Sequence, residues 1–194
     1  PGKPRPGSYA HGLLRGLLAL WVFALLTIDM VWVTAMSNAL TSSLITLPAD
    51  LHVLIEHQVW ARVQGDGTAT VGITQLGIAL SGEIYMCRPR RVGSAVVQGS
   101  TVAVVELSKS IVAVKSPVTG TIVEVNPALE DRPDWVHRDP YGADWIARLR
   151  LDDFATDQAQ LLHGAAASEA MAEHARRFAS ELIPATSTAP KAQP

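Results

Sequence analysis

One lysine stands out among the residues of this chain that could do chemistry. The stretch "VVELSKSIVAVKSPVTG", residues 104–120, contains two runs rich in β-branched residues that meet at residues 106–110. Pairing "TVAVVE" with "IVAVKSP" as a hairpin leaves Leu107 to Ser110 as the connection, so the amine of Lys109 should project into solvent. A turn lysine is more often only a solvated charge, and the surrounding sequence must decide between a functional and a structural role.

The other reactive side chains exclude several classes of function. Cys87 is the single cysteine, which rules out an intrachain disulfide framework or a multi-cysteine metal site, and we expect it to be a packed strand residue. None of the six histidines has HxxxH or HExxH spacing, and no GxGxxG, P-loop or GxSxG motif occurs. The charge is nearly balanced, with 16 basic and 18 acidic residues, which does not favour nucleic-acid binding. We therefore predict no metal site and no catalytic residue.

The elements that position Lys109 are expected within residues 47–152. Short strand-like runs alternate there with turn residues, at the spacing of a small β sandwich or barrel. Asp66-Gly67 predicts a hairpin turn between "WARV" and "ATVGIT". The Pro- and Asp-rich residues 127–145 are typical of a long surface loop, which ends in the strand "WIARLRL".

The flanking regions differ in composition from this β-rich part. Residues 153–183 favour one or two amphipathic helices, weakened near Gly164, and residues 184–194 are expected to be disordered. One apolar stripe of this helical extension can be formed by Phe154, Leu161, Leu162, Met171, Phe178 and Leu182.

Residues 1–46 form an apolar leader, and we expect a hydrophobic helix there. Residues 13–36 are long enough to span a bilayer, although Asp29 near the middle opposes insertion. A signal peptide and a start site further along the chain, at Met36, remain open as alternatives to a membrane anchor.

Several ordered motifs identify residues 47–152 as similar to one family. They are "LPADL", Trp60, "GDGTATVGIT", "LGIALSGEIYM", "RPRRVGSAVVQGSTVAVVELSKS", "SPVTGTIVEVNPAL" and "DPYGADWIARL". This pattern resembles the glycine cleavage system H protein, whose lysine bears lipoic acid in amide linkage. The resemblance implies a mainly β, flattened barrel-sandwich hybrid of the lipoyl/biotinyl type, with C-terminal helices.

The resemblance also assigns roles around the hairpin. Lys109 matches the lipoyl attachment site, and Glu106, three residues earlier, matches the acidic residue that contributes to recognition by the lipoyl ligase. Gly93, sixteen residues before Lys109, and Gly120, eleven after it, match the glycine turns that frame the hairpin. Lys115 lacks this framing, so it is a poor alternative attachment site.

The function implied is that of a carrier rather than an enzyme. Lipoate on Lys109 would shuttle an aminomethyl group between partner enzymes. Those partners are a pyridoxal-phosphate glycine decarboxylase, a folate-dependent aminomethyltransferase and a dihydrolipoyl dehydrogenase, and a lipoyl ligase or transferase would modify the lysine. The implied location is cytoplasmic, with membrane attachment if residues 13–36 insert.

The predicted cargo pocket departs from the family pattern. It would be lined by His57, Val59, Trp60 and Ala113, but Val59 and Ala113 stand where the family has carboxylates that hold the aminomethylated arm. Restoring both acids, by Val59→Glu with Ala113→Asp, is expected to raise aminomethyl loading.

Three interpretations of this departure stay open. In one, a diverged H protein uses Glu56 or water in place of the missing acids. In another, the chain resembles the H-like lipoate-binding carriers that serve the sulfur-oxidising heterodisulfide-reductase-like complex. The third, from a different class, is a membrane-anchored interaction module whose Lys109 is never modified.

Overall fold

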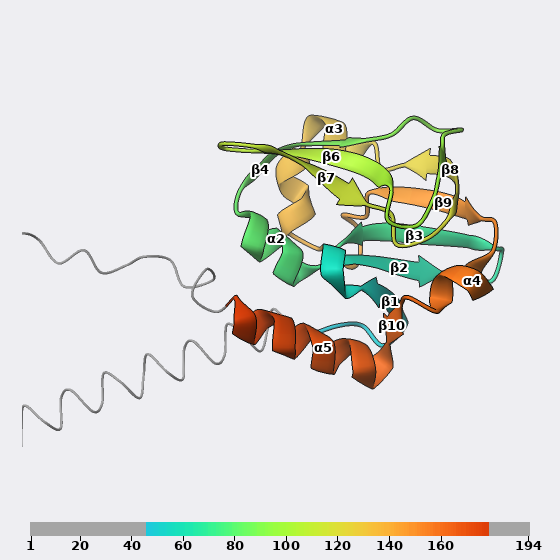
Figure 1. The fold of residues 1–194 in the computed structure, drawn as a ribbon. Helices are drawn as coiled ribbons and strands as arrows, with labels where there is room; N and C mark the ends of the chain where they lie inside the picture. The colour runs from blue at the N-terminus through green and yellow to red at the C-terminus, as the bar shows by residue number, and fades with distance from the viewer. Residues whose placement is uncertain (1–45, 179–194) are drawn as a thin grey trace, which may run out of the picture. The chain divides into compact units, whose positions relative to one another are not determined.

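The computed structural model describes residues 46–178, which form two antiparallel β-sheets packed face to face (Figure 1). The predicted fold class is confirmed as a mainly β, flattened sandwich with a C-terminal helix, and its two sheets remain separate instead of closing into a barrel. The predictions of an apolar leader with a hydrophobic helix and of a disordered tail concern residues 1–45 and 179–194, outside the described part.

The larger sheet has seven strands, in the order β10-β1-β2-β3-β9-β8-β5. The strands are β1 (Leu51–Leu54), β2 (Val59–Val63), β3 (Thr68–Ile73), β5 (Ala95–Val96), β8 (Gly120–Val125), β9 (Ala147–Leu151) and β10 (Leu162–His163). The turn predicted between β2 and β3 is present: Gly67 has φ +78°, and the Asp66 carboxylate accepts hydrogen bonds from the backbone N–H and hydroxyl of Thr68.

The smaller sheet has three strands, in the order β4-β6-β7, and contains the hairpin that ends at Lys109. Its strands are β4 (Ile84–Pro89), β6 (Thr101–Leu107) and β7 (Ile111–Lys115). Because β7 pairs only with β6 in the described chain, it forms one edge of this sheet. Figure 1 shows the β6–β7 hairpin lying over the larger sheet, with its tip extending past the neighbouring elements.

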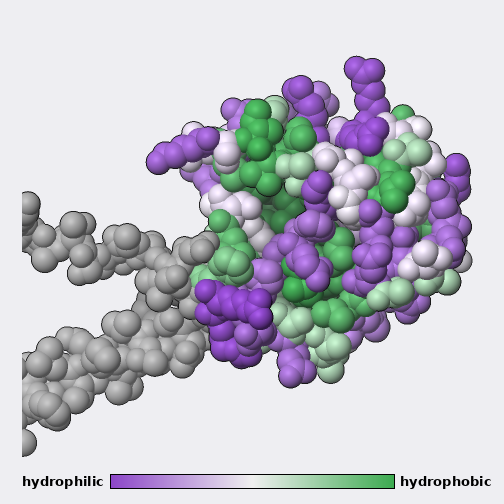
Figure 2. Space-filling view, in the orientation of Figure 1, coloured by the Kyte–Doolittle hydropathy of each residue, from purple (hydrophilic) through white to green (hydrophobic). Residues whose placement is uncertain are grey.

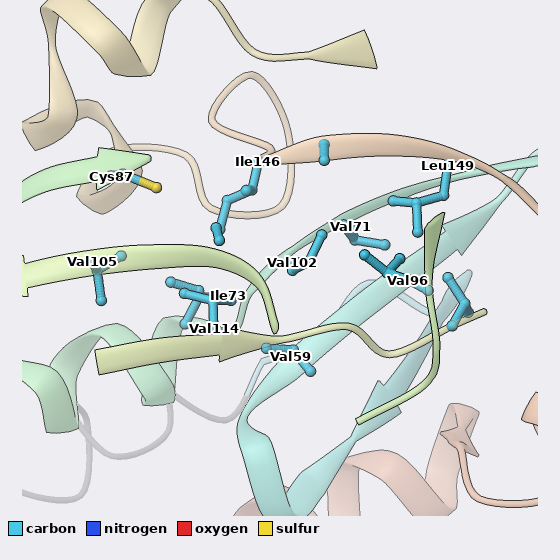
Figure 3. Packing of buried hydrophobic residues seen from close by; sticks show 14 of the residues in the cluster. Val59, Val71, Ile73, Cys87, Val96, Val102, Val105, Val114, Ile146 and Leu149 are labelled. Carbon is cyan, nitrogen blue, oxygen red and sulfur yellow. The ribbon is translucent and has the colours of Figure 1, made fainter. Parts of the chain in front are cut away.

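The main core lies between the two sheets. Figure 3 shows Val105 and Val114 of the smaller sheet directed toward Val59, Val71 and Ile73 of the larger one. Period-two alternation sends every second side chain of β2, β3 and β9 into this layer, whereas register shifts interrupt the alternation in β4, β6 and β8.

A second core lies on the opposite face of β1 and β2. There Leu51, Val53 and Trp60 pack against Met171 and neighbouring alanines of α5 (Gly164–Arg177). Both faces of these two strands are therefore covered, which explains why their residues are apolar in near-continuous runs.

Three elements differ from the sequence-based expectations. Helix α2 (Gln75–Ser81) had no prediction; it begins at Thr74, whose hydroxyl accepts a hydrogen bond from the backbone N–H of Gly77. The expected surface loop 127–145 contains α3 (Ala128–Asp131) and the 3-10 helix η2 (Pro133–His137). Buried Leu129 and Val136 attach these helices to the main core, so the segment is not an open loop.

The C-terminal extension is also not purely helical. It contains α4 (Phe154–Gln158), then β10, and only then α5. The interruption comes at β10, which pairs with β1, and Gly164 with φ +59° begins the next helix instead of weakening one. The predicted apolar stripe is accordingly divided, since Leu161 belongs to the core between the sheets and Met171 to the one under α5.

Within residues 46–178, no helix has the length and hydrophobicity needed to cross a bilayer.

Candidate functional site

The site is organised around the tip of the β6–β7 hairpin. Glu106 and Ile111 form the last cross-strand pair, and the backbone N–H of Leu107 donates to the carbonyl of Ser110 over 2.8 Å. This short connection leaves the Lys109 side chain exposed, without an ion pair or hydrogen bond to any other described residue. Its amine is therefore free for covalent attachment.

The two connections that flank the hairpin are joined to each other in the larger sheet. The segment before β6 forms β5 and the segment after β7 leads into β8, and these two strands pair directly. Gly93 has φ +87°, a conformation that favours glycine, and its N–H donates to the carbonyl of Ile122 over 2.8 Å. The hairpin is thus held at both ends by one sheet.

Gly120 is required for a different reason, because β8 approaches β9 closely at this residue. A Cβ atom built on Gly120 would lie 2.2 Å from the carbonyl oxygen of Arg150. The predicted framing glycines therefore lie at the base of the hairpin, one in a turn and one at a strand contact, and not beside Lys109.

A buried carboxylate reinforces this base. Asp157 of α4, only 4% exposed, accepts hydrogen bonds from the backbone N–H and the hydroxyl of Thr119. The Gln98 amide donates to the carbonyls of Asp157 and Pro117, each at 2.9 Å. These contacts connect the C-terminal extension to the segment that precedes β6 and to the segment that follows β7.

A cavity of about 250 Å³ opens between the hairpin strand β7 and the larger sheet. Figure 2 shows a recess beneath the hairpin sheet with hydrophobic side chains at its bottom. The cavity is lined by Glu56, His57, Gln58, Val59, Ile73, Gly77, Leu80, Ser81, Val105, Val112, Ala113, Val114 and His174. Three residues of the predicted cargo pocket, His57, Val59 and Ala113, therefore meet in one place.

The 3-10 helix η1 (Ile55–His57) determines which residues line the wall and which line the floor. Gln58 ends it in the left-handed conformation, with φ 53° and ψ 42°. The buried Gln58 amide accepts from the Thr74 hydroxyl at 2.6 Å and donates to the Ile55 carbonyl at 3.0 Å. Because this turn is fixed, Val59 becomes a buried floor residue, while Glu56 and His57 stay exposed on the wall.

Trp60 does not line the cavity, and the prediction that grouped it with the cargo pocket needs correction. Its indole is fully buried in the second core, where Nε1 donates to the Ile73 carbonyl over 3.0 Å. Adjacent residues of a strand face opposite sides, so Val59 and Trp60 cannot both face the cavity.

The sequence reasoning missed several cavity residues, including Leu80 and Ser81 of α2 and His174 of α5. The cap at Thr74 could have revealed α2. No local signal could have found His174, because its position depends on how α5 packs against the sheet.

Other candidate reactive groups have structural surroundings. Burial raises the pKa of the Cys87 thiol to about 12, so this residue is not a thiolate nucleophile at neutral pH. His137 accepts a hydrogen bond at Nε2 from the backbone N–H of Ile84, 3.1 Å away. Residues 46–178 contain no cluster of three or more metal-binding side chains.

Fold and site together define a class of carrier protein: a sandwich that holds an exposed lysine at the tip of a hairpin whose return strand lines a small cavity. The family model for glycine cleavage H-protein matches residues 51–174. The chain is 40% identical over 131 residues to glycine cleavage system H protein 3 of Aquifex aeolicus, covering 66% of this chain and 81% of that protein.

Two further comparisons agree with this assignment. The chain is 44% identical over 107 residues to the glycine cleavage system H protein of Xanthomonas campestris pv. campestris, covering 55% of this chain and 81% of that one. A crystal structure of the glycine cleavage system H protein from Mycobacterium marinum superposes with a TM-score of 0.55 at 29% identity, covering 66% and 98% of the two chains. The chain belongs to the glycine cleavage H-protein family.

Proposed function

We propose that this protein is a lipoyl carrier of glycine cleavage, with lipoate in amide linkage to Lys109. The observation that carries the proposal is the exposed, unpaired amine of Lys109 on a hairpin fixed at both ends. A long arm on a rigid support can deliver its reactive end to separate enzymes, so the protein raises effective concentration without catalysing the steps itself.

The surface between Lys109 and the cavity suits a hydrocarbon arm. Along β7, Ile111 is 69% exposed and Val112 is 41% exposed, and Ala113 at the cavity is exposed as well. Ala113 is four residues from Lys109, a span of at most about 14 Å for an extended chain. An arm folded back along β7 would bury these apolar side chains and place its end group in the cavity.

Glu56 is the residue we propose as the cavity's carboxylate. The family carboxylates expected at Val59 and Ala113 are absent, but Glu56 reaches the same cavity from η1. A cationic aminomethyl group held there would gain charge-assisted hydrogen bonds of roughly 1.5–3 kcal/mol each. A carboxylate in the cavity favours a cationic cargo over the neutral or anionic sulfur intermediates of the sulfur-carrier interpretation.

The partners follow from the proposed function. A glycine decarboxylase would load the aminomethyl group, an aminomethyltransferase would unload it, and a dihydrolipoyl dehydrogenase would reoxidise the dithiol. Glu106, exposed on β6 opposite Ile111, is the residue we propose for recognition by the lipoyl ligase or transferase.

Replacing Lys109 tests the attachment site. In cells that express a lipoyl ligase, Lys109→Arg should remove lipoate from the intact mass and abolish aminomethyl transfer. The free energy of unfolding should change by no more than about 0.5 kcal/mol, because the side chain is exposed and the charge is kept. The matched control is Lys115→Arg on the return strand, which should remain lipoylated. Lipoate found on a residue other than Lys109 would contradict the assignment.

A further inference from the structure

A histidine from the C-terminal helix lines the cargo cavity opposite the hairpin, and neither the sequence motifs nor the family comparison assigns it a role. We propose that His174 is a cargo-binding residue that accepts a hydrogen bond from the aminomethyl ammonium and substitutes for the carboxylate missing at Ala113. This inference rests on the proposed carrier function and specifies how this chain's cavity holds its cargo.

The packing of α5 fixes where His174 lies. Ala167, Met171 and Ala175 are at most 1% exposed and attach the helix to the second core under β1 and β2. Helix α5 also packs against η1, which brings His174 to the cavity wall formed by Glu56 and His57. The position of the histidine is therefore set by a buried helix face instead of a mobile loop.

Stacking further restricts the imidazole ring. Its centroid lies 4.9 Å from that of Phe178, one helical turn further along, with an interplanar angle of 25°. His174 is partly buried, whereas His57 on η1 is exposed. A ring held in this way loses less conformational freedom on binding than an exposed one.

The remaining polar side chains of the cavity are already used in the fold. Both ends of the Gln58 amide are hydrogen-bonded, and the Ser81 hydroxyl donates to the Gly77 carbonyl over 2.8 Å. In contrast, no hydrogen bond among the described residues involves the side chains of Glu56, His57 or His174. These three are the groups left to receive a polar cargo.

The chemistry of the cargo matches this set. A primary ammonium has three N–H donors, and a neutral imidazole offers one acceptor nitrogen beside the two oxygens of a carboxylate. Glu56 can neutralise the charge and His174 can accept a second donor from the α5 side. With these two acceptors in place, the cavity can hold the ammonium without a carboxylate at Ala113.

Release of cargo from the arm provides the test without any partner enzyme. Full-length lipoylated protein is reduced and treated with formaldehyde and ammonia, which form the aminomethyl thioether with loss of water. Hydrolysis later consumes one water and returns the thiol, formaldehyde and ammonium. We expect His174→Phe, which keeps the stacked ring but removes the acceptor nitrogen, to release ammonium about tenfold faster, the change expected for one lost hydrogen bond of about 1.4 kcal/mol.

Two further variants separate binding from structure. His174→Asp returns a carboxylate acceptor to the cavity and should release ammonium no faster than the wild type. Glu169→Gln, on the exposed part of the same helix, should leave the release rate unchanged. In labelled protein, loading should also shift the ring ¹⁵N resonances of His174, which a residue with only a packing role would not show.

The outcomes distinguish the two proposals. If Lys109 carries no lipoate in the wild type, the proposed function fails regardless of His174. If Lys109 is lipoylated and the aminomethylated His174→Phe protein releases ammonium at the wild-type rate, the role of His174 is wrong and the carrier function stands.

Discussion

At the scale of single residues, the cargo cavity differs from the family pattern in the positions that supply its polar groups. The left-handed turn at Gln58 directs Glu56 toward the cavity wall and buries Val59 in the floor. The absence of an acid at position 59 is therefore not equivalent to the absence of an acid from the cavity. An alignment of the short motif on Trp60 could not show that Glu56 lines the cavity.

The same geometry changes the expectation for restoring the two family acids. Ala113 is exposed, so Ala113→Asp should fold normally and slow the release of the aminomethyl group several-fold by adding a second carboxylate. Val59 is 1% exposed, so Val59→Glu should lower the free energy of unfolding by roughly 3 kcal/mol or more, because a carboxylate would be buried without a partner.

Urea unfolding combined with the release assay checks both variants. The earlier expectation of a gain from the double variant then holds only for Ala113→Asp. A stable Val59→Glu protein with slower release would show that the cavity floor can open to accept the acid.

At the scale of elements, the hairpin depends on strand contacts far from its tip. Gly120→Ala should lower the free energy of unfolding by about 1–3 kcal/mol, because the added Cβ would meet the Arg150 carbonyl oxygen at 2.2 Å and push β8 away from β9. Urea denaturation measures this loss, and hydrogen exchange should quicken at the β8–β9 amides.

Gly65→Ala is the matched control for this substitution. Gly65 has no atom within 4 Å of an added Cβ and no positive φ, so the change should be neutral or slightly stabilising. Equal stability of the two variants would mean that β8 and β9 can separate without cost.

At the scale of the whole molecule, three aromatic rings join the C-terminal extension to the first strand. His52 stacks on His163 of β10 at 4.3 Å and meets the edge of Phe154 at 5.0 Å. Burial, and then the nearby His163, hold the pKa of His52 below its usual value of 6.5. The folded state therefore disfavours protonation of this side chain.

This arrangement predicts a pH dependence of stability. A depressed histidine pKa contributes stability above pH 6.5, and the contribution is lost as pH falls from 6.5 toward the pKa of the folded state. The free energy of unfolding should thus decrease between about pH 7.5 and 5.5, and His52→Phe, which keeps an aromatic ring, should flatten the curve. Asp144, whose burial raises its pKa from 3.8, acts in the opposite direction but at lower pH.

Urea titrations at several pH values in this window provide the measurement. An unchanged slope in His52→Phe would assign the pH dependence to other groups.

Much of the fold and part of the site could be predicted from the sequence because their signals are local. The hairpin with Lys109 at its tip is indicated by β-branched runs on either side of a short polar connection. The turn between β2 and β3 is indicated by the Asp66-Gly67 pair. The strand β10 has only two residues and pairs with β1, so no periodicity could reveal it. His174 likewise joins the cavity through the packing of a helix distant in sequence, which local patterns do not encode.

The pairing of β1 with β10 has a consequence for folding during translation. The carbonyl of Leu51 contacts the His163 ring across a separation of 112 residues. The seven-stranded sheet therefore cannot be completed while the chain is still being synthesised up to β10, and α5 cannot cover Trp60 before then. Until α5 has been synthesised, the apolar face of β1 and β2 that this helix later covers stays exposed. Chaperones can bind this face during translation.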